Sequence, residues 1–267
     1  MMVVVMNTKI PNPGPGYADN KNYIVNYETS PKRIRVVYKE EVIVDAMDAL
    51  ILYESNHVPI YYFPRHSVDF EKLLASSHKT NCPYKGYASY YSIIVNNYKA
   101  ENAVWSYEHP YDEILGIKNY LAFYWNKVDH WYEEDEEVFV HARSPRVRID
   151  ILNSSRKVTV LVNNKIIAET VRAKFLIETN HPTRYYIPRD DVVARLLPSS
   201  TITNCPYKGK ARYYSIRVGD VIYEDIAWFY KDPVLESDDI QNYICFYNEK
   251  VDEISVDYIS EIKSSVK

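Results

Sequence analysis

The chain has 267 residues, enough for one large domain or for two domains of ordinary size that each bury a core. Its formal net charge is −4 and its isoelectric point is about 6.0, so general electrostatics give no reason to bind nucleic acid or acidic lipid. The 27 tyrosines against 7 phenylalanines favour sheets and half-wet aromatic pockets, because the tyrosine ring packs while its hydroxyl seeks a partner.

The opening run MMVVVM is too short for the apolar part of a signal peptide, and no stretch approaches the roughly 18 to 20 apolar residues of a membrane span. We therefore expect a cytoplasmic protein without a membrane partner. The three cysteines, Cys82, Cys205 and Cys245, are an odd set without CxxC spacing. They support neither a disulfide framework nor a zinc site, and no zinc is expected.

The first predicted elements follow a turn-rich segment, PNPGPGY at 11–17, which we expect to run extended along the first domain. Residues 33–46 are β-branched runs around a short polar turn, a pattern typical of a hairpin. Two more strands are expected at 49–54 and 60–64. Pro64 should end the second of these strands because proline has no N–H for the ladder.

The next segment, SVDFEKLLASS at 67–77, has an N-cap-like residue and apolar positions at helical spacing, and it predicts one short helix. Strand character resumes at 88–95 and 102–107, and residues 109–125 predict a helical turn that leads to a closing strand. This pattern amounts to about six or seven short strands and one or two helical turns in each copy of a repeat.

The repeat is evident from TNCPYKG, which occurs at 80–86 and again at 203–209, an offset of 123 residues (203 − 80). A period this long indicates two similar domains, since solenoid repeats span about 20 to 50 residues. We expect a mainly β protein with domains at 1–137 and 157–267, joined by an ordered connecting strand within 138–156. The acidic run EEDEE at the end of the first domain is expected to be a solvated cap.

Five motifs occur twice in the same order: YYFPR, TNCPYKG, ASYYS, NAVWSY and YLAFYW in the first copy, with EEDEEVFVHARSPRVRIDIL between the copies. In these motifs the chain resembles the tandem form of the uncharacterised family called domain of unknown function 427 (DUF427), from about the NPGPG segment to about Glu253. The resemblance implies two compact β-tent-like domains of short antiparallel strands, similar in outline to methionine sulfoxide reductase B and to the ligand-binding domain of cereblon. Many β-tent proteins hold zinc with two CxxC pairs, which this sequence lacks. The family is also labelled a nucleotidyltransferase family, and this label alone implies an enzyme, without transferable catalytic residues.

The CPYKG part of the repeated heptapeptide predicts a tight loop ahead of a strand, because proline fixes φ and Gly86 or Gly209 permits a positive φ. Lys85 and Lys208 then have two interpretations. They project as cationic ligands for a carboxylate or phosphate, or they pack their stems and extend the ammonium group to solvent.

Cys82 and Cys205 are candidate nucleophiles, since a thiolate beside a cation has a lowered pKa. The repeated histidines, His57 and His181, are the only candidate bases in both copies, and the sequence does not place them beside the thiols. A buried structural role for both cysteines is favoured.

The aromatic strands give further candidates. Tyr61 and Tyr62 should point to opposite faces, so only one of the two is expected in the interior. Arg65 either closes a pocket together with Tyr62 or pairs with a local acid such as Asp69, and Arg189 has the same alternatives with Asp191. Glu54 and Glu178 are candidate Mg²⁺ ligands, although a surface or hairpin role is favoured for both.

The leading hypothesis is a pocket in each domain that binds a small planar or anionic metabolite, such as a nucleotide. The alternatives are an enzyme, of nucleotidyltransferase type or thiol-dependent, and a structural or protein-interaction module. The cofactor, ligand identity and oligomeric state stay open, and nucleic acid is an unlikely partner. The predicted ligand-binding residues are Tyr62, Arg65, Cys82, Tyr84, Lys85, Tyr90, Trp105 and Tyr107, with the second-copy equivalents Tyr186, Arg189, Cys205, Tyr207, Lys208, Tyr213, Trp228 and Tyr230.

Overall fold

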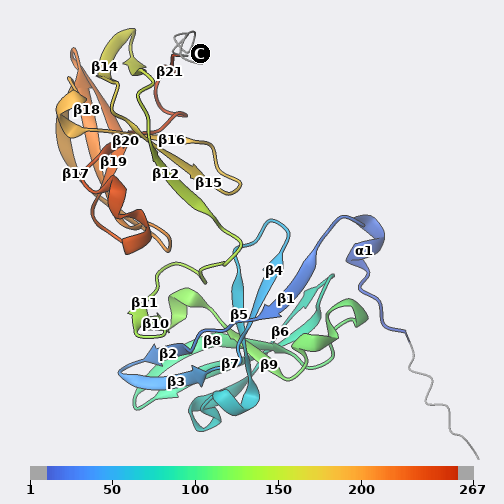
Figure 1. Cartoon of the computed structure of the whole chain (residues 1–267). Helices are drawn as coiled ribbons and strands as arrows, with labels where there is room; N and C mark the ends of the chain where they lie inside the picture. The colour runs from blue at the N-terminus through green and yellow to red at the C-terminus, as the bar shows by residue number, and fades with distance from the viewer. Residues whose placement is uncertain (1–10, 258–267) are drawn as a thin grey trace, which may run out of the picture. The chain divides into compact units, whose positions relative to one another are not determined.

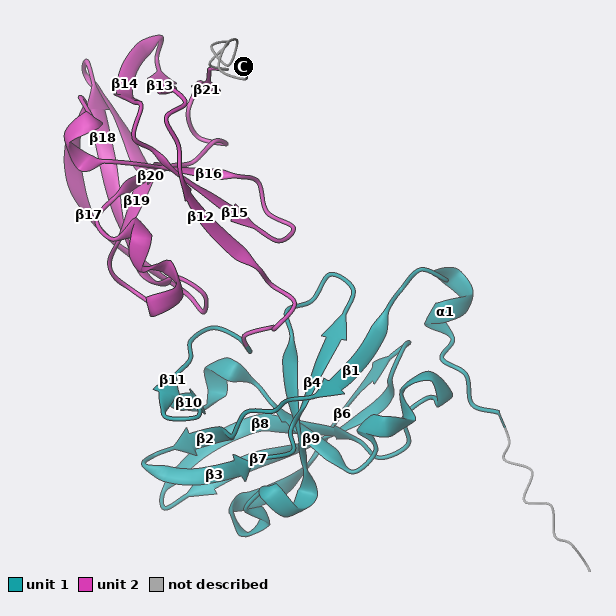
Figure 2. Ribbon diagram, in the orientation of Figure 1, with its two compact units in different colours: residues 1–142 teal, residues 143–267 magenta. Residues whose placement is uncertain are grey.

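A computed structural model of the chain describes residues 11–257 and contains two compact units, residues 1–142 and 143–267 (Figure 2). The MMVVVM run lies outside the described residues. No helix among residues 11–257 is long and apolar enough to cross a membrane. Both units are mainly antiparallel β, as the sequence predicts, and each contains a seven-stranded sheet and a smaller sheet (Figure 1).

Unit 1 has its large sheet in the order β1-β4-β5-β9-β8-β7-β6. These strands are β1 (Val25–Thr29), β4 (Leu50–Glu54), β5 (Ile60–Pro64), β6 (Leu73–Cys82), β7 (Gly86–Val95), β8 (Tyr98–Tyr107) and β9 (Tyr120–Phe123). The small sheet, in the order β11-β10-β2-β3, contains β2 (Ile34–Tyr38), β3 (Glu41–Ala46), β10 (His130–Glu133) and β11 (Glu136–Glu137). The helical segments are α1 (Gly16–Asp19) and 3₁₀ turns at Arg65–Ser67, Phe70–Lys72, Asp112–Ile117 and Trp125–Lys127.

Unit 2 repeats this plan, with the large sheet in the order β12-β15-β16-β20-β19-β18-β17. These strands are β12 (Ile149–Asn153), β15 (Lys174–Glu178), β16 (Arg184–Ile187), β17 (Arg195–Cys205), β18 (Gly209–Val218), β19 (Val221–Pro233) and β20 (Ile244–Phe246). The small sheet, in the order β14-β13-β21, contains β13 (Val158–Val162), β14 (Lys165–Thr170) and β21 (Glu253–Val256). Its 3₁₀ turns are Arg189–Asp191 and Leu235–Ile240.

The hairpin predicted at the start of each copy is confirmed, and its turn chemistry is visible in the backbone. In unit 2 Asn163 and Asn164 join β13 to β14 with φ values of 52° and 55°. Positive φ at both central residues is the type I′ arrangement that matches strand twist, and asparagine adopts it more readily than most residues. Lys39 and Glu40 adopt φ of 51° and 67° at the equivalent turn in unit 1.

The large sheet of unit 1 is buried on both faces. Tyr61 packs in one core cluster with Phe63, whereas Tyr62 packs in a second cluster with Leu52 and Trp105. Consecutive strand residues point to opposite faces, and both Tyr61 and Tyr62 are at most 2% exposed. The expectation that only one of the two enters the interior is therefore wrong, because it assumed a sheet with one wet face.

The predicted short helix at 67–77 is also wrong. Two single 3₁₀ turns occupy its first half, and from Leu73 the chain continues as β6, where Leu73 pairs with Ile93 of β7. The equivalent DVVARLLPSS segment likewise becomes β17 after one 3₁₀ turn. Pairing with a neighbouring long strand supplies the backbone hydrogen bonds here, and it overrides a local helical pattern.

The segment expected to connect the copies divides between the two units. Its strand is β12, which pairs with β15 as the first strand of unit 2, just as β1 pairs with β4 in unit 1. Residues 138–148 contain no strand. The described residues hold eleven strands in unit 1 and ten in unit 2, more than the six or seven predicted. The sequence pattern missed β1, β6, β10 and β11 in the first copy and β17 and β21 in the second, whereas β12 was predicted as the connecting strand.

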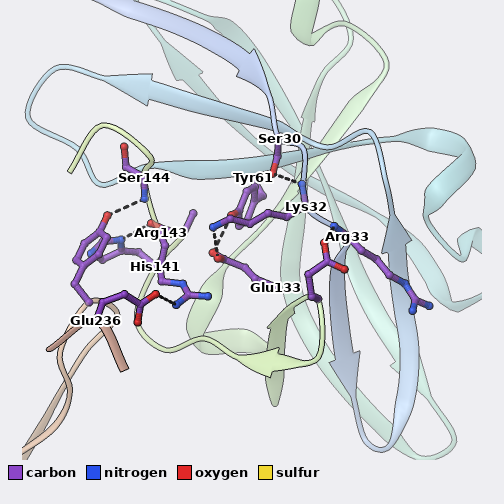
Figure 3. Close-up of polar contacts among 12 residues, drawn as sticks. Ser30, Lys32, Arg33, Tyr61, Glu133, His141, Arg143, Ser144 and Glu236 are labelled. Atoms are coloured by element: carbon purple, nitrogen blue, oxygen red, sulfur yellow. Dashed lines mark hydrogen bonds and ion pairs between the residues drawn. The ribbon is translucent and has the colours of Figure 1, made fainter. Parts of the chain in front are cut away.

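The acidic run at 133–137 is only partly the solvated cap that was predicted. Glu133 is 3% exposed, accepts a hydrogen bond of 2.8 Å from the Tyr61 hydroxyl, and pairs with the Lys32 ammonium group at 2.5 Å. Figure 3 shows these side chains converging between strands of unit 1. Asp135, by contrast, has a side chain that is 94% exposed. Glu133 is thus a buried carboxylate whose charge is compensated by hydrogen bonds and an ion pair.

We predict that Glu133→Ala lowers the free energy of unfolding of unit 1 by about 1–3 kcal/mol, because it removes a buried acceptor of the Tyr61 hydroxyl and the carboxylate that pairs with Lys32. Urea denaturation of the variant measures this loss. Asp135→Ala is the control and should change stability by less than about 1 kcal/mol, since exposed ion pairs contribute little. Equal effects of the two variants would contradict the assignment.

Candidate functional site

Unit 1 contains a cavity of about 590 Å³ at the turn between β4 and β5 and the end of β9. Its polar lining residues include Glu54, His57, Lys85 and His141. Nine of its eighteen lining residues are aromatic, and they come from both core clusters of the sheet. These aromatic residues are Tyr61, Tyr62, Tyr90, Trp105, Tyr107, Phe123, Tyr124, Trp125 and Trp131.

Lys85 and Glu54 form an ion pair in the cavity wall, and their side chains are 8% and 5% exposed. Glu54 is the last residue of β4, and its second carboxylate oxygen accepts a hydrogen bond of 2.9 Å from the Tyr23 hydroxyl. The ammonium group is therefore turned inward onto a carboxylate of its own chain. This arrangement differs from both predicted roles, in which it binds an external anion or extends to solvent.

Unit 2 has the same ion pair. The Lys208 ammonium nitrogen lies 2.6 Å from a carboxylate oxygen of Glu178, and the two side chains are 11% and 9% exposed. Lys208 and Glu178 are the second-copy equivalents of Lys85 and Glu54. The pair therefore belongs to the repeated fold, and it explains why the lysine of TNCPYKG occurs in both copies.

The backbone of this loop is the tight turn that the sequence predicts. Cys82 and Gly86 face each other across the β6–β7 hairpin, and Gly86 has a φ of 111°. A Cβ atom on Gly86 would lie 3.0 Å from the carbonyl oxygen of His109. Gly209 has a φ of 95° at the same position in unit 2. Glycine is needed at both turns for its positive φ, and at Gly86 also for the close backbone approach.

Trp105 and Tyr62 form the buried corner of the cavity. The Trp105 Nε1–H donates to the Tyr62 hydroxyl oxygen at 3.3 Å, and the rings meet edge to face at 86°. Trp228 and Tyr186 repeat the hydrogen bond at 3.3 Å and the angle at 86°. Burial raises the pKa of Tyr62 above its ordinary value, so its hydroxyl keeps a proton to donate even in alkaline solution.

Tyr124 forms the outer edge of this corner. Its ring centroid lies 4.6 Å from that of Trp105, and 38% of the residue is exposed. Burial, followed by its hydrogen bond with Tyr90, raises the pKa of Tyr124 to about 12. The Tyr90 hydroxyl in turn lies 2.9 Å from the hydroxyl of Thr80. Hydrogen-bonded hydroxyl groups therefore run from Tyr124 through Tyr90 to Thr80 beside the aromatic wall.

The structure brings five of the eight first-copy candidates together in the cavity lining: Tyr62, Lys85, Tyr90, Trp105 and Tyr107. Arg65 lies outside the lining, pairs with Glu108 at 3.3 Å, and stacks over the Phe70 ring at 4.7 Å. Asp69, its proposed acidic partner, instead accepts a hydrogen bond from the N–H of Glu71. Arg189 donates to the Tyr214 hydroxyl at 2.7 Å, and Asp191 pairs with Arg172.

Tyr84 also lies outside the cavity lining and holds the N-terminal segment. Its ring stacks on that of Tyr23 at 3.6 Å and meets Tyr17 edge to face. The Gly16 N–H donates to the Pro83 carbonyl oxygen at 3.0 Å, so the segment packs on unit 1 as predicted. In unit 2 the Tyr207 hydroxyl accepts a hydrogen bond from the Ser144 N–H at 2.8 Å. The tyrosine of CPYKG therefore anchors a preceding segment in both copies.

The three cysteines are free thiols. Cys82 and Cys205 are half-buried, and Cys82 is not a lining residue of the cavity. Cys245 is fully buried, and desolvation raises the pKa of its thiol above the ordinary range. Among residues 11–257, no three His, Cys, Asp or Glu side chains form a cluster suited to a metal ion, and Glu54 and Glu178 bind lysines.

Sequence reasoning missed part of the cavity. Trp125 and Trp131 stack with centroids 4.2 Å apart and planes at 6°, and both line the cavity with Tyr124. The motif YLAFYW contains Tyr124 and Trp125, so its aromatic ending was the available signal. His141 gave no signal, because it lies in irregular backbone far along the chain from the other lining residues.

Comparison with known families gives a match to the family described as a domain of unknown function (DUF427), also named NTP_transf_9, over residues 26–134 and 150–257. The chain belongs to the DUF427 family. The two matched regions cover β1 to β10 and β12 to β21, so each unit is one DUF427 repeat. A search of curated proteins found no match.

We predict that Lys85→Met destabilises the first DUF427 repeat by about 3 kcal/mol, because it leaves the buried Glu54 carboxylate without its cation. The double variant Lys85→Met/Glu54→Gln should recover part of this loss, and the coupling is measured by a double-mutant cycle in urea. Lys118→Met, at an exposed position, is the control. Unfolding of Lys85→Met at the wild-type midpoint would contradict a structural role for the pair.

We also predict that Cys245 is unreactive in the folded protein. In the variant Cys82→Ser/Cys205→Ser, where Cys245 is the only thiol, a disulfide reagent should react about a hundredfold more slowly than in urea, since a buried thiol with a raised pKa forms little thiolate. Comparable rates in buffer and in urea would show that Cys245 is accessible.

Proposed function

We propose that the first DUF427 repeat is a binding module for a small planar molecule. The observation that carries the proposal is the cavity of about 590 Å³ with nine aromatic lining residues. Small-molecule pockets typically have about 300–1,000 Å³ and combine aromatic walls with a few polar groups. Flat rings suit such a wall, because stacked and edge-to-face contacts need planar partners.

The polar groups would set the orientation of the ligand. The Lys85–Glu54 pair offers donors and acceptors side by side, and the protonated Tyr62 hydroxyl lies in the same wall. Because Glu54 balances the charge of Lys85, the pair favours hydrogen bonding to the edge of a ring over attraction of a phosphate group. Of the two predicted ligand classes, a planar molecule therefore has more support than an anionic one.

The alternative functions have less support. A thiol-dependent reaction would use Cys82, which does not line the cavity. A nucleotidyltransferase would use carboxylates to bind metal, and the oxygens of Glu54 and Glu178 bind lysine ammonium groups. A purely structural role would give no use for a cavity lined by nine aromatic residues.

We predict that at least one member of a panel of planar probes binds the full chain, with the panel containing adenosine, AMP, nicotinamide, benzamide and benzamidine. Tyr124→Ala should weaken that probe about tenfold through the lost stacking contact, at little cost in stability because the residue is 38% exposed. Quenching of tryptophan fluorescence, with Trp105 in the wall, provides the measurement. If adenosine binds, AMP should bind with similar affinity.

Tyr247→Ala is the matched control, since Tyr247 is the equivalent residue of the second repeat. It should leave the probe affinity unchanged. Absence of binding by every probe, or equal affinity for wild type and Tyr124→Ala, would refute the proposed function and favour a structural module.

A further inference from the structure

Both DUF427 repeats contain the tryptophan–tyrosine pair that forms the aromatic corner, with nearly the same ring geometry. In the first repeat Trp105 and Tyr124 have ring centroids 4.6 Å apart at 45°. In the second repeat Trp228 and Tyr247 have centroids 4.4 Å apart at 47°. The same surface for a ring or a cation is therefore built twice.

In the second repeat this surface is occupied by a side chain of the protein itself. The guanidinium carbon of Arg184 lies 5.6 Å from the Trp228 ring centroid and 5.9 Å from that of Tyr247. Both distances are within the range of a cation–π contact, and a guanidinium group is also planar enough to stack. The Arg184 guanidinium group thus makes a cation–π contact with both rings at once.

Arg184 is fixed in this position by acceptors that follow Tyr247 in the chain. Two guanidinium nitrogens donate to the two Glu249 carboxylate oxygens at 3.1 and 2.9 Å, and one of them also donates to Asn248 Oδ1 at 2.9 Å. The Arg184 side chain is 20% exposed. The bidentate ion pair with Glu249 therefore holds Arg184 in one place, unlike a freely rotating surface arginine. We call Arg184 and Glu249 together the plug of the second repeat.

The first repeat lacks both charges of this plug. Ile60 pairs with Leu52 in the same register as Arg184 with Leu176, and Asn126 stands at the position of Glu249. Ile60 and Asn126 both line the cavity. Tyr124 is 38% exposed and Tyr247 is half-buried, and only Tyr247 has an arginine over its ring among the described residues.

We infer that Arg184 occupies in the second repeat the place that the planar cation of an external ligand takes in the first. This inference rests on the proposed function and adds the ligand class: a guanidinium, an amidinium or a protonated nitrogen heterocycle. The negative faces of Trp105 and Tyr124 attract the cation. A lysine contacts the tyrosine in both repeats, Lys127 at 5.1 Å from the Tyr124 centroid and Lys250 at 4.7 Å from the Tyr247 centroid, so the arginine over the rings is what the second repeat adds. Asn126, which lines the cavity at the position of Glu249, can supply an amide oxygen as acceptor, as the Glu249 carboxylate does for Arg184. A further consequence is that one chain binds one ligand, in the first repeat.

Benzamidine and benzamide test the inference, because they have nearly the same shape and only benzamidine is cationic at neutral pH. Calorimetric titration of the full chain should give one benzamidinium per chain, bound about tenfold more tightly than benzamide. Ile60→Arg/Asn126→Glu, which copies the plug into the first repeat, should abolish this binding. Arg184→Ile/Glu249→Asn, which removes the plug from the second repeat, should raise the stoichiometry from one to two.

The outcomes separate this inference from the proposed function. Equal affinities for benzamide and benzamidinium, both lowered by Tyr124→Ala, would overturn the cation class and leave the planar site in place. Binding of no planar probe would overturn both. Two bound ligands per wild-type chain would contradict the claim that Arg184 and Glu249 block the second site. A folded Ile60→Arg/Asn126→Glu variant with wild-type affinity would contradict it as well. If that variant fails to fold, a stoichiometry that stays at one in Arg184→Ile/Glu249→Asn overturns the plug instead.

Discussion

A buried lysine–glutamate pair determines where the parts of each DUF427 repeat meet. Lys85 comes from the β6–β7 hairpin and Glu54 from the end of β4, two segments about thirty residues apart in sequence. Neither charge can remain buried without the other, so the hairpin turn and the β4–β5 turn must lie together. This constraint places one wall of the cavity. The same constraint holds in the second repeat, because Lys208 meets Glu178 in the same way.

The large sheet with two buried faces explains the abundance of tyrosine. Such a sheet needs aromatic side chains on both sides, and each hydroxyl group that enters the interior needs a partner. Tyr61 donates to Glu133 on one face, and Tyr62 accepts from Trp105 on the other. Phenylalanine would fill the same volume without these fixed directions. The polar groups in the cavity wall are thus the same hydroxyl groups that form hydrogen bonds within the core.

The two repeats keep this scaffold and differ at the corner that a ligand would reach. Trp125 and Trp131 stack in the first repeat, and Asn248 and Ile254 stand at their positions in the second. Asn248 there accepts a hydrogen bond from Arg184, the residue that covers the aromatic rings. The two corners have nearly the same ring geometry, with centroids 4.6 and 4.4 Å apart. Duplication therefore supplies an internal comparison, in which a few side chains at the rim differ around the same pair of rings.

The sequence by itself determined the mainly β class, the two copies, the hairpin turns with their glycines, and five of the residues that line the cavity. These features follow from local φ preferences, from alternation along strands and from repetition, all of which can be seen in one dimension. Only the tertiary structure decided that residues from Leu73 onward form a strand, that Tyr61 and Tyr62 are both buried, and that Lys85 faces Glu54. Each of these depends on a partner distant in the chain, because strand pairing, burial on a second face and the neutralisation of a charge are settled only when separate segments meet.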